Sequence, residues 1–111
     1  GPPFANGRLH IGHFLNKTLK DIIVRCRMAE GYSVRLRPGW DCHGLPIEQK
    51  ALASNDIDKH DTLAVRKRCR EFALAAQHEQ SQDVKRWGLL GDLDRPYMTL
   101  DKEYEAAQIR V

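Results

Sequence analysis

Two histidines set around a glycine, His10-Ile11-Gly12-His13, have the clearest chemical potential near the start of this chain. A turn-rich stretch precedes them and an apolar helical pattern follows, so they lie where a loop enters the amino end of a helix. Such an end carries unpaired N–H groups and a partial positive charge, which suit a phosphate. On a first helical turn the imidazoles would share a face and could donate hydrogen bonds to a phosphoryl group. Gly12 leaves space for a ligand close to the backbone.

Other interpretations of this pair stay open at this point. Histidines three residues apart are common on exposed surfaces and also form half of many metal sites. The cysteines are odd in number and match no zinc spacing, so we expect no metal ligand set and free thiols in a reducing compartment. They are Cys26, Cys42 and Cys69. Cys42 and His43 could suggest a thiol–imidazole nucleophile, but adjacent residues rarely present both side chains to one point.

A second candidate region is the loop that contains Asp41. It reads Gly39-Trp40-Asp41-Cys42-His43-Gly44-Leu45-Pro46-Ile47-Glu48. A short carboxylate at a predicted strand end is well suited to pair with an ammonium group. Trp40 could wall a pocket or pack in the core, which is the more common fate of a tryptophan. Glu48 begins a short helix predicted over residues 47–53, where it could simply favour the helix dipole.

The elements around these loops form half of a βαβ unit. Apolar residues at helical spacing predict a helix from Leu15 that Gly31 ends, and residues 32–37 alternate as a strand does. The helical stripe comprises Leu15, Leu19, Ile22, Ile23 and Cys26. With a first strand upstream of Gly1, a right-handed crossover makes the sheet parallel. Ligands sit beyond the carboxyl ends of such strands, so both loops are expected at one edge.

The second half of the chain reads as a polar connector, a long helix, a loop and a last helix. Asp61 is predicted to cap the long helix, which runs to about Trp87, and residues 77–83 are polar enough to be exposed or kinked. Its apolar stripe comprises Val65, Cys69, Phe72, Ala73, Ala76, Val84 and Trp87. Residues 97–100 read as a short extended piece, and Asp101 could cap a helix over 102–110. A basic cluster has two interpretations, a solvated face or a nucleic-acid contact. It comprises Arg66, Lys67, Arg68 and Arg70.

Composition is that of one globular domain of modest size. The 111 residues are 41% hydrophobic and 30% charged, with a formal net charge of +3. That charge permits an anionic partner without requiring one. No apolar run approaches the roughly 20 residues needed to cross a bilayer, so no membrane association is expected. The chain lacks an initiator methionine and begins abruptly, which suggests a fragment whose upstream strand is missing.

Two strings in the chain carry a family resemblance that covers essentially its whole length. The first resembles the first signature of class I aminoacyl-tRNA synthetases and consists of Gly1-Pro2-Pro3-Phe4-Ala5-Asn6-Gly7 with His10-Ile11-Gly12-His13. The block from Gly39 to Glu48 resembles the next block of the isoleucyl enzymes, and residues 87–101 also look like that family. The resemblance implies an α/β fold. Residues 1–111 would be the first half of a Rossmann-like nucleotide-binding catalytic domain with an incomplete parallel sheet, without the editing and anticodon-binding domains.

The resemblance also implies a reaction and a set of roles. ATP and isoleucine would condense to isoleucyl-adenylate and pyrophosphate, and the acyl group would pass to tRNA(Ile); Mg²⁺ is expected with ATP. His10 and His13 match the histidines that hold the ATP phosphates and stabilise the transition state. Gly12 matches the glycine against which adenine packs. Asp41 matches the carboxylate that binds the substrate ammonium, and Pro2 the residue whose carbonyl assists it. Trp40 lies in the same block, with a less direct role.

The chain departs from the family pattern in ways that bear on function. It lacks the second signature, Lys-Met-Ser-Lys-Ser, so the isolated chain is expected to be inactive. Alternatives are another nucleotidyltransferase of the His-x-Gly-His type and a non-catalytic or degenerate synthetase fragment. The wording of residues 102–110 is similar to mitochondrial members, which predicts a mitochondrial matrix location, with the bacterial cytoplasm as the alternative. The oligomeric state does not follow from these residues.

Overall fold

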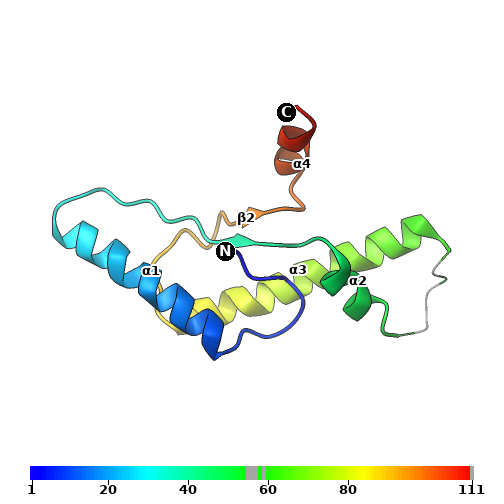
Figure 1. Cartoon of the computed structure of the whole chain (residues 1–111), viewed down its shortest axis with the longest axis horizontal. Coiled ribbons are helices and arrows are strands. Elements are labelled where there is room, and N and C mark those ends of the chain that lie inside the picture. Colours follow the sequence, from blue (N-terminus) through cyan, green and yellow to red (C-terminus); the bar gives the residue numbers. More distant parts are fainter. Residues whose placement is uncertain (55–57, 59, 111) are drawn as a thin grey trace.

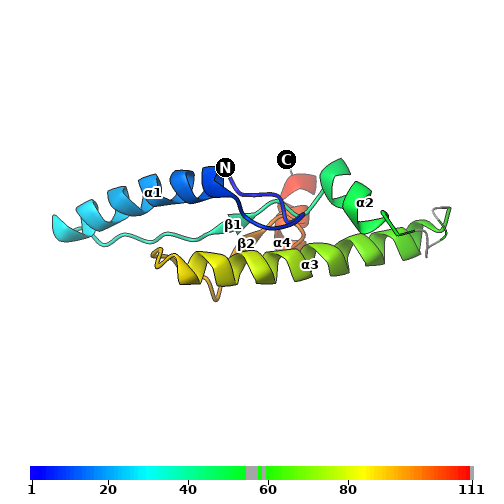
Figure 2. The ribbon, with the colours of Figure 1, turned by 90° about the horizontal axis from the view of Figure 1, so that it is seen from below.

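The structure is a computed structural model that describes residues 1–54, 58 and 60–110. Within them lie six elements in chain order (Figure 1): α1 (Ile11–Ala29), β1 (Gly39–Trp40), α2 (Leu45–Ala51), α3 (Thr62–Arg86), β2 (Tyr97–Met98) and α4 (Lys102–Ile109). Figure 2 shows the strands at a level between α1 and α3. The arrangement is a partial α/β sheet with helices to either side. Most of the predicted connector, at 55–57 and 59, lies outside the described residues.

The sheet is parallel, as predicted. Gly39 pairs with Tyr97 and Trp40 with Met98 between β1 and β2. On the other side of β1, Phe4 forms an isolated parallel bridge with Asp41. Three parallel segments of the described chain therefore lie side by side, in the order residue 4, β1, β2. The first strand was expected wholly upstream of Gly1, whereas the described residue that pairs with the end of β1 is Phe4.

The prediction of a strand over residues 32–37 is wrong, because β1 begins only at Gly39. Some of the expected alternation survives, since Val34 and Leu36 are half-buried between exposed neighbours. The carbonyl of Leu36 accepts a hydrogen bond from the Asp92 amide at 3.0 Å. A regular strand needs a row of partners on a neighbouring strand. The segment that faces residues 32–37 here is the irregular loop at 88–96, so no ladder forms.

Helix α1 ends as predicted, but its apolar stripe is not buried. Gly31, just beyond the helix, has φ +88°, the left-handed conformation expected of it. Four stripe residues are 51–62% exposed, namely Leu15, Leu19, Ile22 and Ile23. The buried residues are Asp21 and Val24, on the other side of the helix. That side meets the end of α3 and the loop after it, where Asp21 accepts a hydrogen bond from the Leu90 amide at 2.8 Å.

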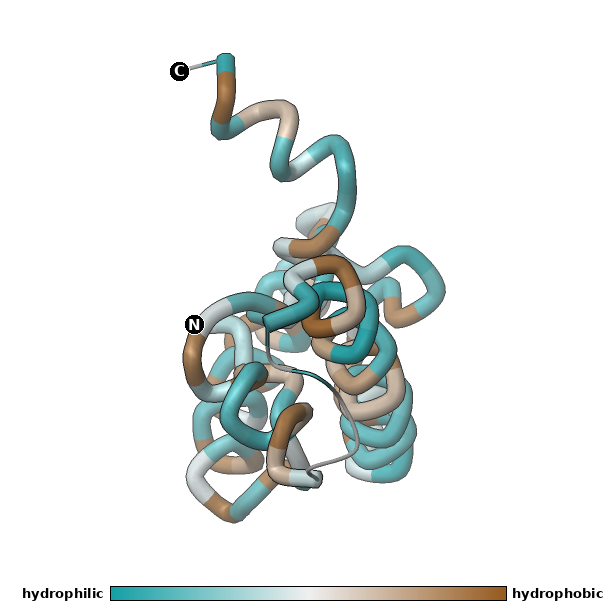
Figure 3. Tube along the Cα trace, turned by 90° about the vertical axis from the view of Figure 1, so that its right-hand side faces the viewer, coloured by the Kyte–Doolittle hydropathy of each residue, from teal (hydrophilic) through white to brown (hydrophobic). Residues whose placement is uncertain are grey.

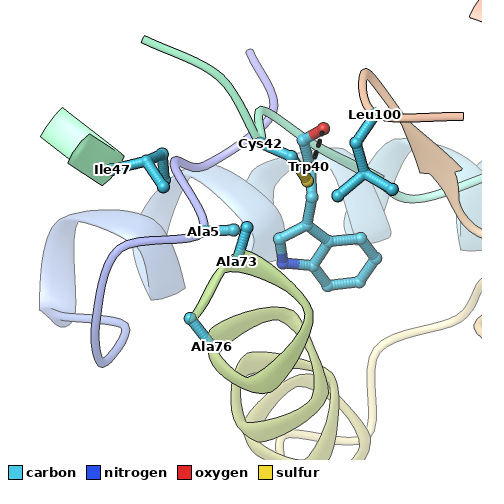
Figure 4. Packing of buried hydrophobic residues seen from close by; sticks show 7 residues of the cluster. All are labelled: Ala5, Trp40, Cys42, Ile47, Ala73, Ala76 and Leu100. Carbon is cyan, nitrogen blue, oxygen red and sulfur yellow. Dashed lines mark hydrogen bonds between the residues drawn. The ribbon is translucent and has the colours of Figure 1, made fainter. Parts of the chain in front are cut away.

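Helix α3 begins as predicted and runs unbroken through its polar part. The Asp61 side chain accepts hydrogen bonds from the Leu63 and Ala64 amides at 3.0 and 3.1 Å. Residues 77–83, predicted to be exposed or kinked, instead bury three polar side chains: Gln80, Ser81 and Asp83. These residues lie on the same side of α3 as the buried Ala73 and Ala76, which is the side that contributes to the core. The core cluster (Figure 4) comprises Ala5, Trp40, Cys42, Ile47, Ala73, Ala76 and Leu100.

The remaining elements differ from prediction only at their ends. Helix α2 begins two residues earlier than expected, after Gly44 at φ +91°, and ends at Ala51. The short extended piece is β2, and α4 follows it as predicted, although the Asp101 side chain makes no capping hydrogen bond. Figure 3 shows α4 extending away from the other elements. None of the described helices combines the length and apolarity needed to span a membrane.

Candidate functional site

The His10 and His13 side chains lie together at the start of α1, with ring centroids 3.9 Å apart. His10 is the N-cap residue rather than part of the first turn. Its Nδ1 accepts a hydrogen bond from the Gly12 amide at 3.1 Å, and His13 Nδ1 accepts one from the His10 amide at 3.2 Å. This is a reciprocal capping box built from two imidazoles in place of the usual hydroxyl and carboxylate. The predicted pairing of the two rings is confirmed.

The capping bonds determine which ring nitrogen of each histidine carries a proton. Because both Nδ1 atoms accept, each neutral imidazole holds its proton on Nε2, as follows from the hydrogen-bond network. Burial lowers the pKa of His13 from its usual value, and His10 and Lys17 lower it further. His13 therefore offers a neutral Nε2–H donor at neutral pH, and the His10 ring lies beside it at the same positively biased helix end.

Gly12 has a steric reason to be glycine. A Cβ atom there would lie 2.9 Å from His10 Cε1 and 3.1 Å from His10 Nδ1. The space above the Gly12 backbone, expected to admit a ligand, thus also accommodates the His10 ring. A side chain at this position would push that ring out of its cap, so the glycine serves the geometry of the histidine pair.

Asp41 directly follows β1 and is half-buried. The Ala5 amide donates to its carbonyl at 2.8 Å, and its own amide donates to the Pro3 carbonyl at 2.9 Å. Its side-chain Oδ1 accepts a hydrogen bond from the His43 amide at 3.3 Å, which orients the carboxylate. Because the paired segments are parallel, Asp41 and the loop that leads to His10 leave the sheet at the same edge (Figure 1). The loop that leads to His10 and the loop after β1 therefore begin at one edge of the sheet.

Trp40 directly precedes Asp41 in the chain, but its side chain lies in the core rather than at the edge of the sheet. Trp40 is 1% exposed, packs in the core, and donates from Nε1 to Gln80 Oε1 at 2.9 Å. Pro2 and Trp40 line a cavity of about 270 Å³ beside Gly39 and Tyr97, the first residues of the two strands. Core packing, the more common fate considered for Trp40, is therefore the one observed.

The Cys42-His43 step does not form a thiol–imidazole pair. Cys42 is buried, and burial is the main cause that raises its pKa to about 11, so the thiol stays protonated at neutral pH. Its amide donates to Thr99 Oγ1 at 2.9 Å. His43 is exposed and its Nε2 lies 3.6 Å from a carboxylate oxygen of Glu105. The two side chains thus point into different surroundings, as predicted for adjacent residues.

Three polar contacts at this edge were missed in the sequence. Gln80 donates to the carbonyls of Phe4 and Gly7 at 2.9 and 2.5 Å, and Arg8 pairs with Asp83 at 3.2 Å. One signal could have found Gln80, because it lies four residues after Ala76 and continues the buried stripe of α3. Among the described residues, no group of three His, Cys, Asp or Glu side chains is placed to hold a metal ion.

Comparison with known proteins places this geometry in a family. The family model for class I tRNA synthetases (I, L, M and V) matches residues 1–111. The isoleucine–tRNA ligase of Rippkaea orientalis is 54% identical over the whole chain, and those of Crocosphaera subtropica and a Nostoc species are 55% and 56% identical. The chain spans 12% of the length of each of these relatives.

The source of these relatives corrects one expectation and supports another. They are cyanobacterial proteins, so the mitochondrial location expected from residues 102–110 is wrong. The resemblance seen in the two loop strings is confirmed, because identity extends across the chain rather than being confined to those strings. Since the family model accounts for all 111 residues, this chain belongs to the class I tRNA synthetases (I, L, M and V).

Proposed function

We propose that this chain is part of the catalytic domain of an isoleucyl-tRNA synthetase. The enzyme would join isoleucine to ATP, forming isoleucyl-adenylate and pyrophosphate, and then transfer the acyl group to tRNA(Ile). The choice of isoleucine is supported by the relatives, which are named isoleucine–tRNA ligases. The observation that carries the proposal is the reciprocal His10–His13 cap, because it uses both Nδ1 atoms and leaves both Nε2 atoms out of the cap at a helix start.

The chemistry of activation needs little more than placement and charge stabilisation. The isoleucine carboxylate is already a nucleophile and attacks the α-phosphorus of ATP, while pyrophosphate leaves. A protein accelerates this step by holding the reactants in line and by donating hydrogen bonds to oxygens that gain charge. His10 and His13 are the donors we assign to the ATP phosphates. The N–H groups at the start of α1 would add to the same field.

The other assigned residues bind the two substrates. Asp41 would pair with the ammonium group of isoleucine at the edge it shares with the loop to His10, with help from the Pro2 carbonyl. Gly12 would pack against adenine. We assign Trp40 an indirect part in amino-acid binding, since its indole is buried directly before Asp41. Mg²⁺ would enter as the ion of Mg·ATP, as part of the substrate.

The test is exchange of labelled pyrophosphate into ATP by the full-length protein that carries this chain. We expect exchange that depends on isoleucine and is slower with valine, although one methylene discriminates by only about 10–200-fold. The isolated 111-residue chain should show no exchange. Absence of amino-acid-dependent exchange would favour a non-catalytic synthetase relative. Exchange that needs no amino acid would favour another His-x-Gly-His nucleotidyltransferase.

A further inference from the structure

Gln80 carries a fully buried side-chain amide in the last third of α3. Only 1% of the residue is exposed, and it continues the buried side of the helix that carries Ala73 and Ala76. Figure 4 shows Ala73 beside Ala5 and close to the Trp40 ring. A primary amide has one oxygen that accepts and one nitrogen that carries two N–H donors. Burial of such a group is costly unless its bonds are made, so its partners identify its role.

All of the hydrogen-bonding groups of this amide are used, and they reach three separate points of the chain. Trp40 Nε1–H donates to Gln80 Oε1 at 2.9 Å. Gln80 Nε2 donates to the Phe4 carbonyl at 2.9 Å and to the Gly7 carbonyl at 2.5 Å. These partners are 40, 76 and 73 residues away in sequence. One side chain therefore connects α3 to two loops that do not follow one another.

Those two loops are the ones that carry the proposed site. Residues 4–7 lead into the His10–His13 cap, and Trp40 immediately precedes Asp41. Besides the packing of Ala5 in the core cluster, the described residues show one more polar contact between α3 and the first loop, the ion pair of Arg8 with Asp83, whose arginine side chain is 72% exposed. Because the arginine end of this pair lies in solvent, the pair contributes little to stability. The buried amide is thus the stronger polar tie between α3 and the first loop.

We propose that Gln80 is a positioning residue for amino-acid activation: it sets the placement of the phosphate-binding histidines relative to Asp41. The inference rests on the proposed function, because it concerns the same site. Gln80 touches neither substrate in this arrangement and acts only through the loops it holds. A misplacement of about 1 Å between reacting groups can lower a rate about 100-fold, so a tie of this kind has measurable consequences.

Two substitutions in the full-length protein separate the parts of this tie. Gln80→Leu removes all three hydrogen bonds, and we expect kcat/KM for isoleucine-dependent exchange to fall about 10- to 100-fold. Gln80→Glu keeps an acceptor for Trp40 but, when ionised, places a charge against the Phe4 and Gly7 carbonyls. Burial and those carbonyls raise the pKa of such a glutamate, and its protonated form regains one donor. Its activity relative to the native protein should therefore recover as pH falls from 8 to 6.

The matched control is Ala76→Gly, one turn earlier on the same buried side. A glycine inside a helix costs about 1 kcal/mol of stability relative to alanine, and this substitution removes no hydrogen bond to either loop. We expect it to lower the melting temperature while kcat/KM stays within about twofold of native, with no recovery at low pH. Hydrogen exchange of peptides covering residues 4–9 and 39–43 should accelerate in Gln80→Leu and not in Ala76→Gly.

The outcomes for Gln80 and for the proposed function are distinguishable. If the native full-length protein lacks isoleucine-dependent exchange, the proposed function fails, and faster hydrogen exchange in Gln80→Leu alone still measures the tie. If the native protein is active and both Gln80 variants match it, the positioning role is overturned. It is also overturned if both variants lose activity only as Ala76→Gly does and Gln80→Glu shows no recovery at low pH.

Discussion

The two loops at the sheet edge are held in contrasting ways. The loop that ends in the His10–His13 cap closes its geometry within four residues, through hydrogen bonds from the Gly12 and His10 amides. The loop around Asp41 is held by residues far away: its backbone pairs with residues 3–5, and Thr99 accepts from the Cys42 amide. The hydrogen bonds of the cap itself should survive distant changes, although the placement of the cap depends on Gln80, whereas a loop built on long-range contacts should respond to such changes directly. This contrast tells an experimenter which side of the site is sensitive to which mutation.

The largest expected effect tests the loop that is closed locally by the His10–His13 cap. His10→Ala or His13→Ala removes one Nε2–H donor and one half of the cap. The rate of isoleucine-dependent pyrophosphate exchange by the full-length protein should fall about 10²- to 10³-fold, the usual cost of losing one preorganised donor. His78→Ala, at an exposed position on α3, is the matched control and should leave the rate unchanged. A loss of only a few-fold would mean that the histidines do not stabilise the transition state.

The next largest effect tests the loop held by long-range contacts, through the proposed binding of isoleucine to Asp41. Asp41→Ala should raise the KM for isoleucine about 10- to 100-fold, since a hydrogen bond to a charged group contributes about 1.5–3 kcal/mol. The KM for ATP should change little, because His10 and His13, the proposed donors to the ATP phosphates, lie on the other loop. Steady-state exchange assays with each substrate varied in turn measure both values. Equal increases in the two constants would mean that the substitution disturbs both loops rather than one.

A smaller effect tests the support beneath Asp41. Thr99→Val keeps the shape of the side chain but leaves the buried Cys42 amide without its acceptor. The free energy of unfolding should fall by about 1–3 kcal/mol, the cost of one buried unsatisfied group. Thermal denaturation of the full-length protein measures it, with Thr62→Val at the exposed start of α3 as control. Equal melting temperatures for the two variants would mean that the Thr99 contact contributes nothing.

The smallest effect concerns pH and the local cap. The folded state lowers the pKa of His13, so between its usual value near 6.5 and the lowered value the unfolded chain binds more protons. His13 therefore makes its full contribution to the free energy of unfolding above pH 6.5. This contribution is lost as the pH falls through the lowered pKa. As the pH falls over that acidic window, the melting temperature of the native protein should fall relative to that of His13→Gln. A relative gain on acidification would contradict the assigned direction.

Comparison of the two long helices shows how far sequence patterns reach. Both helices were predicted, and so were the cap by Asp61 and the left-handed Gly31, because these depend on neighbours a few residues away. Burial was predicted wrongly in part of each. The apolar stripe of α1 is exposed, and the polar stretch of α3 buries Gln80. Hydropathy indicates which faces can be buried, but the partner present in the fold decides which faces are.

The chain by itself determined the proximity of the two histidines, the helices, the parallel arrangement and the family, since these follow from local spacing and from strings of adjacent residues. Tertiary structure alone decided where the strand begins and that Trp40 lies in the core. It also decided that one amide on α3 joins both loops of the site. The physical reason is the range of the interactions. Caps and turns close over three or four residues, whereas a strand ladder or a buried amide needs partners that only the folded chain brings together.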